Sequence, residues 1–170
     1  MTVLLKDVGG GAVSLLAQIQ EQLVLQQGPN FLPVDENGEP VAYVAPGDAI
    51  AFDSPGLIVN LVSIRQGSPG QPVTTWQHFQ AATSFADYAV TILRNSSVVS
   101  NSGIPTPVEI SQDAYTNHLD CSALWSAMLA VEASYEWAGA GVPVVLVGCD
   151  PLGAQGGLMA ARLTVEVELI

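Results

Sequence analysis

The chain of 170 residues has the length of one domain with a sizeable core, since 49% of its residues are hydrophobic. Sixteen acidic residues outweigh four basic ones, so the net charge is −12; the basic residues are Lys6, Arg65, Arg94 and Arg162. Four basic side chains cannot neutralise a run of phosphates, which argues against direct binding of nucleic acid or of an anionic membrane surface. The acidity then serves either solubility alone or a surface that repels phosphate.

The sequence is also that expected of a cytosolic protein. No apolar run reaches the ~18 residues that a transmembrane helix needs, and the N-terminal apolar run is too short for a signal peptide. Cys121 and Cys149 are the only cysteines. One falls in a predicted helix and the other ends an apolar strand, so both are expected to be small buried hydrophobes and not a disulfide framework.

The first predicted element is a helix over residues 12–27, which ends at Gly28-Pro29. Its expected buried face has three-and-four spacing and consists of Val13, Leu16, Ala17, Leu23 and Val24. The polar residues that follow predict an exposed loop over residues 28–40.

Three strands are predicted next, over residues 41–45, 57–65 and 84–94. The second is apolar on both faces and the third alternates, so we expect the third to be covered on one face. Exposed loops are predicted near 66–83 and 95–105. The first of these carries Trp76, His78 and Phe79 as a candidate docking loop.

A second helix is predicted from Thr106 to Trp137. Thr106 at the N-cap, Pro107 at the first helical position and Glu109 at the third form a capping-box pattern. The expected buried stripe consists of Leu124, Trp125, Met128 and Val131.

The C-terminal part predicts two strands. Residues 142–149 read as a buried strand, 150–157 as its turn, and 159–170 as a strand that alternates over its whole length. Val165, Val167 and Leu169 are expected to face inward, and Glu166 and Glu168 to lie exposed on the opposite face. The order α-β-β-β-α-β-β predicts a single α+β domain over residues 1–170, with a mainly antiparallel sheet and two helices on one face.

No arrangement of residues supports a catalytic, cofactor or metal site, and no enzyme is predicted. Asp7 and the three glycines after it lack the spacing of a phosphate-binding loop. His118 and Cys121 share a helix face, but adjacent turns of one helix seldom give a catalytic pair its geometry. The two His and two Cys residues do not have the spacing of a zinc site.

Several segments resemble the tail terminator proteins of long-tailed bacteriophages, particularly those of actinobacterial hosts. They are Lys6-Asp7-Val8, the stretch YVAPGDAIAFD at 43–53 with the strand LIVNLVSIR after it, the strand VPVVLVG at 142–148, the turn PLGAQGG at 151–157 and the closing strand LTVEVELI. They cover about two thirds of the chain. The chain departs from relatives that carry a cysteine where it has Ser54-Pro55.

The resemblance implies a structural protein of the virion that assembles in the host cytoplasm without cofactors. Six copies would form a ring that caps the tail tube and meets the head-side connector or stopper protein. DNA would only pass through the lumen, and Glu166 and Glu168 are the candidate lumen-facing residues. The alternatives are another neck or tail-tube structural protein, such as a stopper or tube subunit, and a small-molecule binding module.

Overall fold

The computed structural model describes residues 7–48, 54–68, 71–72, 83–96, 105–155 and 157–169. Two helices and six strands follow one another along the chain: α1 (Val8–Gln27), β1 (Ala42–Pro46), β2 (Gly56–Ser68), β3 (Gln71–Pro72), β4 (Ser84–Asn95), α2 (Pro107–Ser134), β5 (Val144–Gln155) and β6 (Leu158–Leu169). The predicted order is confirmed, with the two-residue strand β3 as an addition. β3 lies inside the range predicted as the loop 66–83.

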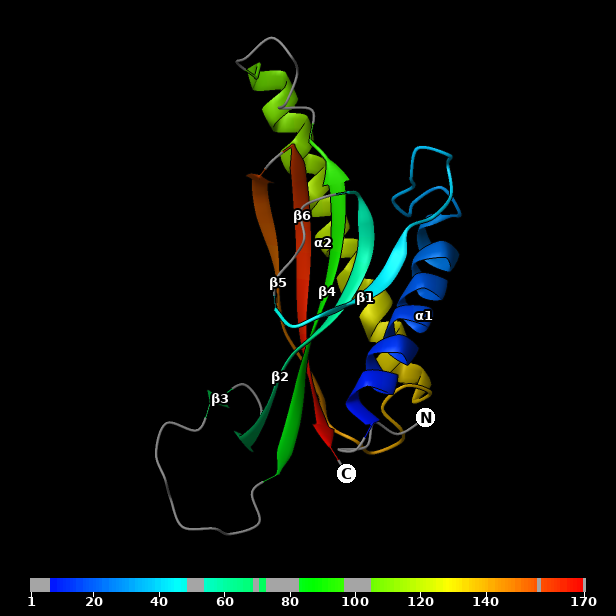
Figure 1. Cartoon of the computed structure of the whole chain (residues 1–170), viewed down its shortest axis with the longest axis vertical. Helices are drawn as coiled ribbons and strands as arrows, with labels where there is room; N and C mark the ends of the chain where they lie inside the picture. The colour runs from blue at the N-terminus through cyan, green and yellow to red at the C-terminus, as the bar shows by residue number, and fades with distance from the viewer. Residues whose placement is uncertain are drawn as a thin grey trace.

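One mixed sheet with the strand order β1-β2-β4-β6-β5 organises the molecule (Figure 1). β1 pairs parallel with β2, and the other neighbours pair antiparallel. Both helices contribute side chains to one hydrophobic core with the same face of the sheet, α1 against β1 and β2, and α2 against β5 and β6. The predicted α+β class, with two helices on one face, is confirmed.

The helix-facing side of the sheet is built from alternate residues of β4 and β6, as predicted. Their side chains are fully buried and comprise Ala86, Tyr88, Val90, Ile92, Val165 and Val167. The other face of β4 is buried too, since Thr91 is 0% exposed. The expectation that only one face of β4 is covered is therefore wrong.

The chain that leaves β1 reaches across the helix-free face of the sheet. The Asn60 side chain on β2 donates a hydrogen bond to the Gly47 carbonyl (2.9 Å). Asp48, one residue further, forms an ion pair with Arg162 on β6. A sequence pattern within β4 cannot reveal this cover, because it comes from another part of the chain.

α1 begins earlier than predicted and buries a different face. Asp7 is its N-cap and accepts a hydrogen bond from the Gly10 amide (3.1 Å), so the three glycines form the first turn of the helix. The carbonyl of buried Gly11 accepts a hydrogen bond from the Trp137 indole (2.9 Å). The buried face is Ala12, Leu15, Ile19 and Leu23, whereas Val13 is 59% exposed. Of the predicted face, Leu23 alone is fully buried.

α2 begins as the sequence predicts. Thr106 and Glu109 form a reciprocal capping box, and the hydrogen bonds from Thr106 lower the pKa of Glu109. The helix ends at Tyr135, which takes the left-handed conformation (φ 56°). Leu124, Met128 and Val131 are buried as expected, but Trp125 is 37% exposed and does not belong to the buried stripe.

β5 is an edge strand and continues through most of the predicted turn. It ends at Gln155, and all its residues up to Ala154 are half-buried or exposed. The predictions of a fully buried strand at 142–149 and of a turn over 150–157 are therefore wrong. The proline and glycines after Cys149 read as a turn, but an edge strand tolerates them because one side of its backbone needs no partner.

The capping box gives a stability prediction. Thr106→Ala should lower the free energy of unfolding by about 0.5–2 kcal/mol, because the Glu109 amide loses its partner. Urea denaturation followed by circular dichroism measures this loss.

Ser111→Ala is the matched control. The Ser111 hydroxyl donates to the Pro107 carbonyl within the same exposed turns, so its loss should cost less than the loss of the cap. Equal stability of wild type and Thr106→Ala would contradict the role of Thr106.

Candidate interaction surfaces

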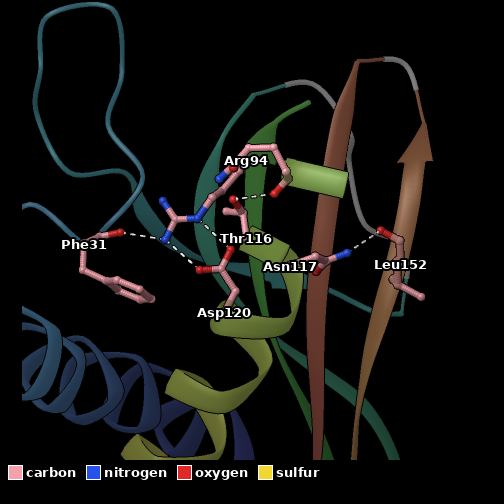
Figure 2. Close-up of polar contacts among 7 residues, drawn as sticks. Phe31, Arg94, Thr116, Asn117, Asp120 and Leu152 are labelled. Atoms are coloured by element: carbon pink, nitrogen blue, oxygen red, sulfur yellow. Dashed lines mark hydrogen bonds and ion pairs between the residues drawn. The ribbon is translucent and has the colours of Figure 1, made fainter. Parts of the chain in front are cut away.

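Arg94 ties the sheet to both helical segments (Figure 2). From β4, its Nε and Nη2 atoms donate to the two carboxylate oxygens of Asp120 on α2 at 2.6 and 2.8 Å. Nη2 also donates to the carbonyl of Phe31, in the segment after α1 (2.8 Å), and the guanidinium lies 4.9 Å from the centre of the Phe31 ring. The Arg94 charge is therefore used inside the fold.

Asp120 is only 2% exposed. Burial raises the pKa of Asp120, although the hydrogen bonds and charge of Arg94 act in the opposite direction. The Asp120 carboxylate therefore has a structural role, since it holds Arg94.

Arg65 occupies a second cluster on the helix-free face. Its Nη2 lies 2.6 Å from Oε2 of Glu166, and its Nε lies 3.2 Å from Oδ2 of Asp87. Asp87 and Glu166 are direct cross-strand partners on β4 and β6. The Ser63 hydroxyl donates to Asp87 as well (2.5 Å). One arginine thus neutralises part of the charge of two neighbouring carboxylates.

This cluster corrects the sequence prediction for Glu166. The residue lies on the face opposite Val165 and Val167, as predicted, but it is only 7% exposed. Alternation along β6 reveals the face and not the burial, because Arg65 comes from β2, two strands away. Glu168 lies on the same face and is half-buried, so it is the more accessible of the two glutamates.

All three arginines of the chain are paired with carboxylates, since Arg162 holds Asp48. Among the residues that the structure describes, no basic side chain therefore stands without an acidic neighbour. An incoming phosphate would have to compete with a carboxylate that is already in place.

The two glutamates should respond differently to charge reversal. Glu166→Lys puts a second cation beside Arg65 at a buried position, and we expect a loss of roughly 3 kcal/mol in the free energy of unfolding. Glu168→Lys should change it by less than ~0.5 kcal/mol, as most substitutions of accessible residues do. Chemical denaturation of both variants measures the difference, and equal stabilities would contradict the Arg65 cluster.

An apolar row runs along the side of α2 that adjoins β5. Trp125 and Leu129 follow Cys121 at four-residue spacing and are 37% and 46% exposed. Cys121 contacts Cys149 of β5, so the row begins at β5 and turns outward. These two side chains, Trp125 and Leu129, are called the flank surface below.

A small pocket lies between the start of α2 and the strands β5 and β6. Its volume is about 280 Å³, and its lining includes Ile110, Asn117, His118, Leu152 and Met159. The Asn117 amide donates to the Leu152 carbonyl (3.1 Å) and holds the helix against β5 (Figure 2). The volume lies below the ~300–1,000 Å³ of typical ligand pockets.

The structure also describes the surroundings of the other candidates from the sequence. The first turn of α1 is occupied by the Asp7 carboxylate, where an anion would otherwise bind. Cys121 and His118 both lie on α2, but the neighbour of the Cys121 thiol is Cys149 of β5 and not His118. Within the described ranges, no three His, Cys, Asp or Glu side chains are grouped to hold a metal ion.

Trp76, His78 and Phe79 lie outside the described residues, as do most of the predicted loops 66–83 and 95–105. No described helix is both long and apolar enough to cross a membrane. Comparison with models of known protein families and with curated proteins finds no match to the chain.

Proposed function

We propose that the protein is a structural component of a bacteriophage virion, a tail terminator whose six copies form a ring on the tail tube. The ring ends tube growth and presents a surface to the head-side connector or stopper protein. It assembles in the host cytoplasm and acts without a cofactor. The proposal rests on the segments that resemble tail terminators and on one structural observation, the engagement of every arginine by carboxylates.

This observation matters because DNA must pass such a ring without binding to it. Six copies at −12 carry −72, and a lumen with part of that charge repels phosphate. The helix-free face, with Glu166 and Glu168, is the lumen side in this proposal. Its arginines lie beside carboxylates, so they offer no cationic track along which DNA could be held.

The flank surface supports contacts between copies. If the helix-free face lines the lumen, neighbouring copies meet along the sides of the sheet, and β5 with α2 forms one of these sides. A ring with rotational symmetry joins two different surfaces of adjacent subunits, so each flank surface would be covered once. Apolar side chains such as Trp125 and Leu129 are typical of the buried centre of such contacts.

Another neck or tail-tube component, such as a stopper or a tube subunit, would use the same acidic face and the same apolar contacts. The assembly itself distinguishes them. A terminator forms closed rings that bind one end of the tail tube, whereas a tube subunit polymerises along it.

The first functional prediction concerns oligomeric state. Light scattering coupled to size exclusion should give the mass of a hexamer for the wild type. Trp125→Glu combined with Leu129→Glu should give folded monomers, because both residues are partly exposed and the new charges repel a neighbouring copy.

Val108→Glu is the matched control on the same helix, since Val108 is 78% exposed and lies outside the flank surface. This variant should remain hexameric. A wild type that stays monomeric over the full concentration range would contradict the ring.

The second functional prediction concerns the lumen. Rings of Glu168→Lys should bind duplex DNA in low salt, with affinity that falls steeply as salt rises, while wild-type rings should not bind. Electrophoretic mobility shift at several salt concentrations measures this. A Glu168→Gln ring controls for the loss of the carboxylate alone. Lys rings that ignore DNA in low salt would place Glu168 outside the lumen.

A further inference from the structure

The fold brings together the only two cysteines of the chain. Cys121 lies on α2 and Cys149 on β5, 28 positions apart in sequence. Cys149 is the register partner of Leu163 and therefore lies on the helix-facing side of the sheet. Both cysteines pack against the same hydrophobic core, and their side chains are neighbours where α2 meets β5.

Both thiols are free and only half-buried, so a small reagent can reach them. Burial raises the pKa of both thiols, and the carboxylates of Asp120 and Asp150 act in the same direction. The thiols therefore stay protonated at neutral pH and react slowly. A dithiol whose thiolates are not stabilised also gives a disulfide that resists reduction, because the reduced state gains nothing from ionisation.

From this juxtaposition we propose that Cys121 and Cys149 are an oxidation site, which closes to an intramolecular disulfide in the presence of a small organic disulfide and fastens α2 to the edge strand β5. The inference concerns the single chain and is independent of the proposed function.

The reaction is thiol–disulfide exchange in two steps. The Cys121 thiolate attacks one sulfur of the small disulfide and releases one thiolate, which leaves a mixed disulfide on Cys121. Cys149 then loses its proton and attacks the Cys121 sulfur, which releases the second small thiol. Two protein thiols are oxidised, and one small disulfide is reduced to two thiols.

Cys121 is the expected first nucleophile. Burial raises the pKa of both thiols, and it raises that of Cys149 more strongly, so Cys121 ionises more readily. Because Asp120 and Asp150 lie nearby, an uncharged reagent should react faster than an anionic one such as oxidised glutathione.

The test treats the dilute, folded, full-length protein with hydroxyethyl disulfide in mildly alkaline buffer. Intact-mass spectrometry should show the loss of two hydrogens without an adduct, thiol titration should fall from two groups to none, and peptide mapping should join Cys121 to Cys149. The melting temperature should rise by roughly 5–10 °C and return to its original value after reduction.

Cys121→Ser and Cys149→Ser are the matched controls. Each should keep one reagent adduct, with no rise in melting temperature, because the second step has no nucleophile. Two adducts on the wild type, disulfide-linked dimers, or two thiols that remain free while urea-unfolded protein reacts, would each overturn the proposal. None of these outcomes depends on whether the chain forms a ring.

Discussion

The rest of the structure depends on the bidentate pair between Arg94 and Asp120, which joins β4, α2 and the segment after α1. The pair lies where the two helices and the sheet meet, and Asp120 has almost no contact with solvent. Loss of either partner would leave the other charge buried and uncompensated, which is far more costly than loss of an exposed ion pair. The position of α2 on the sheet, and hence of the surfaces that α2 carries, follows from this contact.

The chain has few basic residues, and this explains why each arginine lies beside particular carboxylates. With 16 acids and four bases, most carboxylates must rely on solvent, and the few arginines lie where carboxylates come close together. Arg65 is one example, because it serves two acids that the β4–β6 register places side by side. Excess negative charge elsewhere keeps the surface soluble but repels other copies. In the proposed ring, the contacts between copies would therefore lie at the uncharged side chains of the flank surface.

Sequence patterns within one segment predicted the helices, the strands and their order well. They could not predict contacts between segments that are distant in the sequence. The helix-facing sets of β4 and β6 and the capping box at Thr106 follow from local patterns, and the structure confirms them, although both faces of β4 are buried. The start of α1 was missed because glycines favour a flexible segment before a helix. The contact that holds Gly11 comes from Trp137, 126 positions later in the sequence. The burial of Glu166 depends on Arg65, about one hundred residues earlier. Trp125 was assigned to the core because the sequence alone does not show whether an apolar residue at the border of a helix face points to the core or to solvent.

The free edge of β5 is poorly suited to pair with a further strand. Pro151 has no amide hydrogen to offer, and irregular pairing interrupts the ladder with β6 at two places along the strand. Another strand laid beside β5 would find an incomplete row of donors and acceptors, so the sheet resists continuation from one molecule into the next. Open-ended β-type fibres that grow through this edge are thereby disfavoured. Any contact with a neighbouring molecule along this edge would have to be made by side chains and not by the backbone.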